Sequence, residues 1–305
     1  MLLFILRRLL WAVPVLWAVA TLTFVMMHLV PGGPFDREKK LPPEIKANIE
    51  AKYHLDKPFA VQYGLYLKGL LKGDLGPSYK YLGRTVNDVI ADTLPVSIQL
   101  GALALFIALV LGLLAGMASG AFAQTAWDKT SMFFATAGIS IPNFVLGAFL
   151  ILVFSHQFKL FPPALWEDAR SVVLPAFALG LAPAAYIARL TRSSILEEKH
   201  RDYVRTARAK GLPETTILFR HVLKNAITPV ITVLGPLAAT LVTGSFVIEF
   251  IFSVPGMGKF FITAVTNRDY PLIMGVTLVY ALLVVLANLL VDLFYTVIDP
   301  RIQLE

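Results

Sequence analysis

The sequence ARLTRSSILEEKHRDYVRTARAKGLP, from Ala188 to Pro213, is a charged segment between two long apolar stretches. No residue that breaks a helix lies between Ile195 and Lys210, so the pattern predicts one helix that ends at Gly211. Pro213 suits the first turn of a second helix, which we expect to run to about Asn225.

Two rows of residues lie next to each other on the first of these helices. One row has small side chains with one aromatic ring, and the other row is basic. The rows are Tyr203, Val204, Ala207 and Gly211, and Arg201, Arg205 and Arg208. Small residues allow a partner's backbone to approach closely, and arginines pair with carboxylates. The small-residue row favours a docking element, although charge alone fits a cytoplasmic loop that follows the positive-inside rule equally well.

The composition is that of a membrane protein. Of 305 residues, 57% are hydrophobic and 15% are charged, and the mean hydropathy is +0.70. A soluble domain has about 25% charged residues. The chain has no cysteine, which excludes disulfides, thiol catalysis and cysteine metal sites. The net charge of +7 lies in loops between apolar stretches, so it indicates membrane topology rather than nucleic-acid binding.

Six apolar stretches are long enough to span a bilayer, for which roughly 20 residues suffice. They run over about 9–30, 94–123, 130–154, 172–191, 226–248 and 272–298. The first is too long for a signal peptide, and no cleavage site with small residues follows it. The segment 189–224 has nine basic and four acidic residues, which predicts a cytoplasmic location for this segment and for both termini.

A polar region with nearly balanced charge follows the first span. Two stretches within it, 44–53 and 61–71, have apolar residues at helical spacing along one side. A cluster of turn-forming residues follows at 73–78. Because long loops cross the membrane largely regardless of charge, we expect this region to form a small external cap of helices.

Glycine and proline mark two kinds of feature within the spans. Gly112, Gly116 and Gly120 are four apart, which predicts close packing of the second span against a neighbouring helix. Pro142, near the middle of the third span, frees a backbone carbonyl that protein or water must satisfy. Candidates to line a cavity, or alternatively to hydrogen-bond to neighbouring helices, are Thr136, Ser140, Asn143, Thr232 and Thr240. Asp292 in the last span is either functional or interfacial.

The charged segment resembles the coupling loop of ABC-type import permeases of the dipeptide/oligopeptide branch. The resemblance is carried by Arg189–Ser194, Asp202–Leu212 and His221–Ala226, followed by Pro229 at the spacing of that branch. The general importer loop has Glu-Ala-Ala, then three residues, then Gly, and here Arg205-Thr206-Ala207 and Gly211 stand at those places. The leading glutamate is missing, so no role of that acid carries over.

Further landmarks extend the resemblance over nearly the whole chain, and the piece 41–55 is similar in particular to B subunits of oligopeptide permeases. The other landmarks include Arg7-Arg8, Pro31-Gly32, Gly73-Asp74-Leu75-Gly76, Leu174-Pro175-Ala176, Pro255-Gly256, Arg268-Asp269-Tyr270-Pro271 and Asp299-Pro300. The resemblance implies an all-α membrane protein with six transmembrane helices, the type I ABC importer permease fold, and a small helical external insert. Its expected parts are the first span and cap at 1–93, a five-helix core at 94–299 with the coupling loop at about 192–225, and a cytoplasmic tail at 300–305.

The same resemblance implies a complex in a bacterial cytoplasmic membrane. This chain would pair with a homologous second permease, two ABC ATPases and an extracytoplasmic peptide-binding protein, in contact with membrane lipid and without nucleic acid. ATP and magnesium would bind the ATPases, whereas this chain would bind no cofactor or metal and would not be an enzyme. The residues implied in ATPase coupling are Tyr203, Val204, Arg205, Thr206, Ala207, Arg208, Gly211 and Leu212.

Other classes of function fit the sequence less well. A stand-alone secondary transporter would suit the proline-broken spans, but it predicts inverted repeats, which are not seen, and leaves the charged segment unexplained. An intramembrane hydrolase would need a His-Glu-x-x-His or Gly-x-Ser-x-Gly motif, and neither occurs. Gly256-Met257-Gly258-Lys259 lacks the spacing of a phosphate-binding loop. The substrate stays open between oligopeptides, dipeptides, nickel chelates and sugars.

Overall fold

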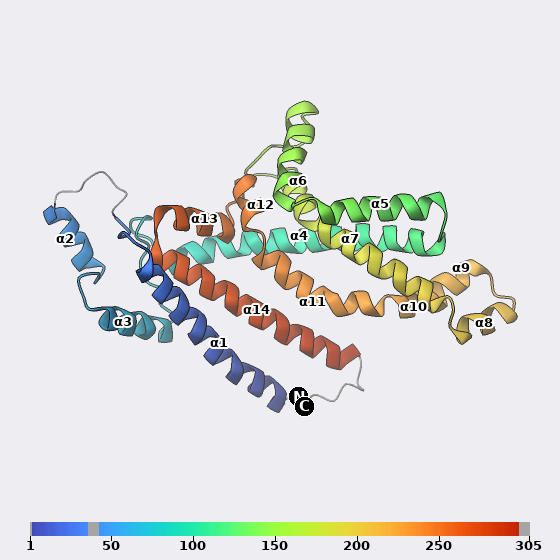
Figure 1. Cartoon of the computed structure of the whole chain (residues 1–305), viewed down its shortest axis with the longest axis horizontal. Coiled ribbons are helices and arrows are strands. Elements are labelled where there is room, and N and C mark those ends of the chain that lie inside the picture. The colour runs from blue at the N-terminus through green and yellow to red at the C-terminus, as the bar shows by residue number, and fades with distance from the viewer. Residues whose placement is uncertain (1, 36–42, 299–305) are drawn as a thin grey trace. The chain divides into compact units, whose positions relative to one another are not determined.

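The computed structural model describes residues 2–35 and 43–298, and its regular elements in these ranges are helices. Five helical segments of the described residues are long and apolar enough to cross a membrane (Figure 1). They belong to α1 (Leu2–Leu29), α4 (Val86–Ala121), α7 (Val173–Glu198), α11 (Thr228–Thr243) with α12 (Phe246–Ile251), and α14 (Tyr270–Ile298). The predicted tail at 300–305 lies outside the described residues, as does the side chain of Asp292.

The third predicted span is not one helix. It is divided into α5 (Ala126–Ser140) and a second piece made of α6 (Asn143–Leu150) and the π-helical η1 (Ile151–Gln157). The two pieces meet at a bend of 105°. Pro142 explains the break, because proline has no N–H and forces the preceding Ile141 into an extended conformation with φ −88° and ψ 122°. Counted as one span, the bent pair raises the total to six, as the sequence predicts.

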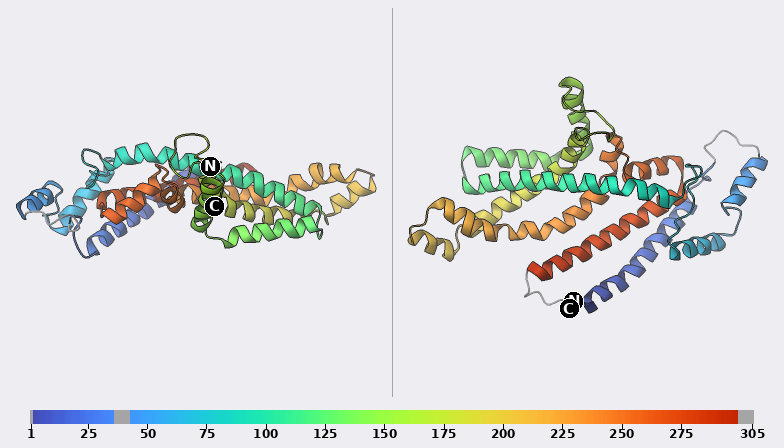
Figure 2. Two further views of the ribbon diagram at one scale, coloured as in Figure 1. Left: turned by 90° about the horizontal axis from the view of Figure 1, so that it is seen from above. Right: turned by 180° about the vertical axis from the view of Figure 1, so that it is seen from behind.

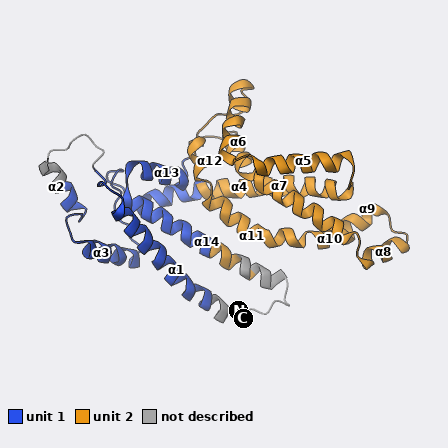
Figure 3. Cartoon of the chain, viewed as in Figure 1, with its two compact units in different colours: residues 1–96, 255–285 blue, residues 97–254, 286–305 orange. Residues whose placement is uncertain are grey.

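The chain forms two compact units (Figure 3). The first unit comprises Met1–Val96 and Pro255–Val285, and thus contains α1, α2 (Pro43–Lys52), α3 (Phe59–Leu71) and α13 (Met257–Asn267). Asp269 is fully buried here and accepts hydrogen bonds from the Ser78 hydroxyl and from the backbone N–H of Tyr79 at 3.1 Å. This carboxylate therefore fastens the segment after α3 to the start of α14.

The second unit, Ser97–Val254 and Leu286–Glu305, is built around α7. This helix packs against α5, α6 and α11 (Figure 2). It also lies against the glycine row of α4. A Cβ atom at Gly112 would stand 2.7 Å from the carbonyl oxygen of Ala184, and one at Gly116 would stand 2.6 Å from that of Ala188. The predicted close packing of this row is confirmed, and its partner is α7.

Candidate functional site

The charged segment folds as a compact hairpin at the end of α7. The prediction of one helix between Ile195 and Lys210 is wrong, because α7 ends at Glu198 and a separate helix, α8, spans Asp202–Ala209. Arg201, between them, has an extended backbone with φ −69° and ψ 151°. Ile195 and Val204 are both fully buried in one cluster with Ile217 and Val222. A straight helix could not bring these side chains together, so tertiary packing overrides helix propensity here.

Gly211 ends α8, as predicted. Its φ of +76° lies in the left-handed region, which glycine adopts without steric cost. Its N–H donates to the carbonyl of Arg208 at 2.9 Å, and the N–H of Leu212 donates to the carbonyl of Ala207 at 3.3 Å. This pair of bonds is the Schellman motif. Pro213 is then the N-cap of the predicted second helix, which consists of α9 (Glu214–Thr216), η2 (Ile217–Val222) and α10 (Leu223–Ala226).

The two predicted rows of α8 face different surroundings. Val204 and Ala207 are buried in the chain's own core, so they anchor α8 and do not form an exposed small-residue surface. Tyr203 is half-buried, and its hydroxyl donates to Glu198. The exposed side is basic: the side chains of Arg205 and Arg201 are 73% and 56% exposed. What α8 offers a partner is therefore its arginine row with Thr206 and Leu212, which are also exposed.

All three arginines of this row already have a carboxylate nearby. Arg208 donates to Glu214 at 2.7 Å, and this hydrogen bond lowers the pKa of the Glu214 carboxyl below its ordinary value. The contact fixes α8 to α9 across the turn at Gly211. Arg205 lies 3.6 Å from the carboxylate of Asp202, which is 97% exposed, so this pair is weak. The charge of Arg205 is thus the one most available to a partner.

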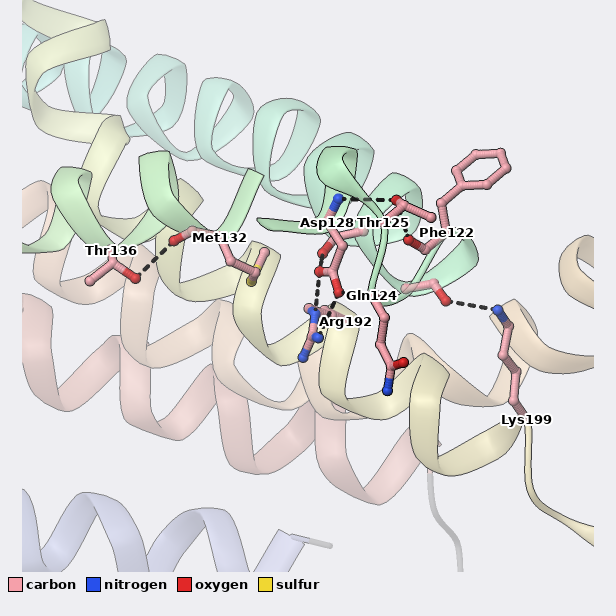
Figure 4. Close-up of polar contacts among 10 residues, drawn as sticks. Phe122, Gln124, Thr125, Asp128, Met132, Thr136, Arg192 and Lys199 are labelled. Atoms are coloured by element: carbon pink, nitrogen blue, oxygen red, sulfur yellow. Dashed lines mark hydrogen bonds and ion pairs between the residues drawn. The ribbon is translucent and has the colours of Figure 1, made fainter. Parts of the chain in front are cut away.

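A second set of polar contacts connects the last turns of α7, which precede α8, to the turn between α4 and α5 (Figure 4). Asp128, in the first turn of α5, is 3% exposed. The guanidinium of Arg192 donates to both of its oxygens, at 2.6 and 2.8 Å. The Ser119 hydroxyl and the Gln124 N–H, at 2.8 Å, complete its hydrogen bonding. A buried carboxylate needs such a full set of partners, so this group is a fixed joint between helices.

Lys199 forms a further tie at the same end of α7. Its Nζ donates to the carbonyl oxygens of Gly120 and Ala121 at 2.8 and 2.9 Å, in the last turn of α4 (Figure 4). Burial lowers the pKa of this ammonium. The sequence interpretation missed Asp128 and Lys199 as positioning residues. The available signal was Thr125 followed by Asp128, because this spacing is typical of a capped helix start, and the Thr125 side chain does accept from the Asp128 N–H.

The predicted pathway residues lie on three elements that all pack on α7. Thr136 and Ser140 belong to α5, Asn143 begins α6, and Thr232 and Thr240 belong to α11. The four hydroxyls donate to carbonyls one turn back in their own helices, for example Thr136 to Met132 at 2.8 Å and Thr240 to Pro236 at 2.8 Å. Each of these hydroxyls thus has an acceptor within its own helix, and the place of these residues in a pathway stays a prediction.

The comparison with known proteins decides the family. Residues 108–304 match the family described as binding-protein-dependent transport system inner membrane component, and residues 1–101 match its N-terminal component. The chain belongs to this family. The permease is 47% identical to the oligopeptide transport system permease protein OppB of Salmonella typhimurium, over 99% of this chain and 100% of that one. It is also 47% identical to the dipeptide transport system permease protein DppB of Bacillus subtilis, over 94% and 93%.

The fold agrees with the family. The MetNI methionine ABC transporter in inward-facing conformations matches the permease with a TM-score of 0.56 and 16% identity, over 69% of this chain and 96% of that one. The all-helical type I ABC importer permease fold is thus confirmed, and the permease is a multi-pass inner-membrane protein. In the described part of the chain, no group of three or more His, Asp or Glu residues could hold a metal ion.

Proposed function

We propose that this permease is a subunit of an ATP-driven oligopeptide importer. It would form the pathway with a homologous second permease, receive peptide from an extracytoplasmic binding protein, and meet an ATPase at α8. The observation that carries the coupling role is the construction of α8: a basic exposed side on a helix anchored by Val204 and Ala207 and ended by Gly211. The peptide substrate is supported by the names of relatives that match over the whole chain.

Force on α8 has a direct route into the membrane helices. The cluster of Ile195, Val204 and Ile217 joins α8 to α7 and η2, so a push on α8 displaces these elements together. Arg192 and Lys199 then connect α7 to α5 and α4. The proposed cycle is a rigid-body shift of α7 with the helices fastened to it. Its energy must come from ATPase contacts that differ between the two states.

Cysteine cross-linking tests the docking surface, because the chain has no native cysteine. In the assembled transporter, Thr206→Cys on the exposed side of α8 should cross-link to a cysteine-bearing ATPase, and ATP should change the yield. The matched control is Ala169→Cys, which is exposed in the segment predicted to lie on the other side of the membrane. Equal yields at Thr206 and Ala169, or none at either, would contradict the proposal.

A dipeptide importer is the second candidate, because the B. subtilis DppB is as similar as OppB. Uptake by the reconstituted transporter with its own binding protein separates the two. We expect ATP-dependent uptake of a labelled pentapeptide. Unlabelled pentapeptide should inhibit this uptake by competition, and a dipeptide should inhibit it only weakly. Uptake of dipeptide alone would assign the second candidate, and uptake without any ATPase would refute both.

A further inference from the structure

Helix α3 packs against α1 within the first unit. The Tyr63 hydroxyl hydrogen-bonds to Thr21 at 2.7 Å, and Gln62 bonds to His28 at 3.1 Å. Between these contacts the ring of Phe24 packs against that of Tyr63 at a tilt of 52°, with ring centroids 5.2 Å apart. The contacts on α1 thus extend over two turns, from Thr21 to His28.

These contacts lie at membrane depth. The apolar span of α1 runs from Leu6 to Leu29. At 1.5 Å per residue it is about 36 Å long, a little more than the roughly 30 Å hydrocarbon core, and Thr21 lies about 12 Å inside the Leu29 end. The neighbouring side chains of Leu22 and Met26 are 61% and 54% exposed, as expected for apolar side chains that face lipid. Because the Tyr63 side chain of α3 reaches Thr21, this part of α3 borders the apolar span.

The side of α3 that faces away from α1 has the composition of a lipid-facing surface. This side, here called the outer face, consists of Val61, Gly64, Lys68, Leu71 and Lys72, all of them exposed. Leu71 is 90% exposed. The stretch from Lys57 to Gly73 contains three lysines and no acidic residue. A helix side that faces water usually carries several kinds of polar residue. A side whose charged residues are all lysines instead fits a membrane surface, because lysine side chains can extend from apolar surroundings to phosphate groups.

We propose that the outer face of α3 is a phospholipid-contact surface, in the leaflet that surrounds the Leu29 end of α1. Val61 and Leu71 lie in the acyl-chain boundary, and Lys68 and Lys72 bind lipid phosphates. The argument rests on continuity with the apolar span of α1 and on charge complementarity with anionic headgroups. It places α3 in the membrane surface itself and is independent of the transported substrate.

Spin labels measure the depth of this face in the complete transporter in lipid nanodiscs. Single-cysteine variants Val61→Cys and Leu71→Cys carry the label, with Leu22→Cys as the lipid-exposed reference and Ala169→Cys as the water-exposed reference. We expect the ratio of oxygen to nickel-chelate accessibility at Val61 and Leu71 to match that at Leu22. A ratio like that of Ala169 overturns the proposal. Shielding that appears only after the binding protein is added also overturns it, and assigns the face to protein docking.

The lysines are tested in the same nanodiscs. Replacing part of a zwitterionic lipid with phosphatidylglycerol should increase the immersion of the label at Leu71. The Lys68→Gln/Lys72→Gln variant should lose this response while keeping its immersion in zwitterionic lipid. The control Lys80→Gln, which removes one positive charge from the first unit outside α3, should respond like the parent. A response that persists in the double variant overturns the assignment of these lysines to phosphate.

Discussion

At the scale of single residues, the buried carboxylate of Asp128 has the largest consequence. It accepts four hydrogen bonds from three residues, which lie at the end of α4, in the following turn and in α7. No spacing in the sequence relates Asp128 to Arg192, which is 64 residues away. The pair could therefore not be predicted, although Arg192 belongs to a motif on which the predicted coupling loop rests. Removing one partner of this ion pair should cost more free energy than the intact pair contributes, because a buried ion without a partner is costly.

Removal of Arg192 should therefore destabilise the permease strongly. We expect Arg192→Met to lower the free energy of unfolding by about 3 kcal/mol, since Asp128 would remain buried and charged. The comparable variant of an exposed pair, Arg84→Met beside Asp92, should cost about 0–1 kcal/mol. Thermal unfolding of the purified transporter measures both. Equal shifts in melting temperature would show that Asp128 does not depend on Arg192.

The pair of Glu214 and Arg208 gives a pH dependence. The folded-state pKa of Glu214 lies below its unfolded value of about 4.3. The pair therefore contributes stability above that value and loses it as the pH falls through the lower folded-state pKa. Both groups are exposed, so the contribution is at most about 1 kcal/mol. The protection of the α8 amides, measured relative to the intrinsic exchange rate at each pH, should fall below about pH 4 in the parent and change less in Glu214→Gln; identical protection profiles would contradict this.

At the scale of elements, close helix contact and helix breaks account for the architecture of the second unit. Gly180 of α7 makes the same kind of close contact with α4 that the glycine row of α4 makes with α7, since a Cβ at Gly180 would stand 2.6 Å from the carbonyl oxygen of Ala104. Both helices thus approach each other without an intervening side-chain layer. The contrast with Gly64 of α3, where a Cβ would meet nothing within 4 Å, provides a matched test of this packing.

The two glycines should respond to alanine with opposite signs. Gly116→Ala should destabilise the permease by about 1–3 kcal/mol, because its methyl group would collide with the backbone of Ala188. Gly64→Ala should stabilise it by about 0.5–1 kcal/mol, because alanine favours a helix and the site has room. Melting temperatures of the two variants give the signs. A neutral Gly116→Ala would mean that the helices can separate without cost.

The end of α8 is the second element that can be tested. Gly211 and Gly83 have φ of +76° and +77°, and a Cβ at either would meet nothing within 4 Å. Leucine at either position thus costs a similar amount of backbone strain, about 1–2 kcal/mol. We expect Gly211→Leu to reduce ATP-dependent uptake roughly tenfold and Gly83→Leu to leave it near the parent value. Equal uptake by the two variants would argue against a coupling role for α8.

The sequence was a good guide to elements set by local chemistry. The glycine row, the helix end at Gly211 and the helix start at Pro213 were predicted because each depends on a few neighbouring residues. The break between α7 and α8 was not predicted, since it follows from the burial of Ile195 and Val204 in one cluster. At Pro142 the sequence predicted a freed backbone carbonyl, but it did not predict the bend of 105°, because helix packing sets the angle.

At the scale of the whole molecule, transport would depend on how motion of α8 reaches the membrane helices. Within the second unit, α7 contacts α5, α6 and α11, which carry the predicted pathway residues. Lys199 stands at the junction, where α7 ends and the last carbonyls of α4 lie within 2.9 Å. Its ammonium hydrogen-bonds to α4 rather than to the proposed docking surface, so we expect its loss to affect transmission rather than ATP hydrolysis.

Lys199→Met should uncouple the two activities. We expect ATP hydrolysis by the assembled transporter to continue, while peptide uptake per ATP falls, because the last turn of α4 would no longer be held at the junction of α7 and α8, although the glycine row still keeps the two helices in contact. Lys210→Met, an exposed lysine of the same segment, is the control and should keep the parent ratio. Parallel loss of uptake and hydrolysis in Lys199→Met would instead indicate a failure of assembly. An unchanged ratio would remove Lys199 from the transmission route.

The contact between α4 and α7 also limits which motions are open to the permease. With Gly112, Gly116 and Gly180 bringing main chain against main chain, nothing compressible separates the two helices. Along the glycine row the two helices are packed closely, so we expect them to move together there rather than to slide or tilt far against each other. The number of independently mobile parts is thus smaller than the number of helices. Any conformational cycle must take its freedom from other joints, such as the corner at Pro142.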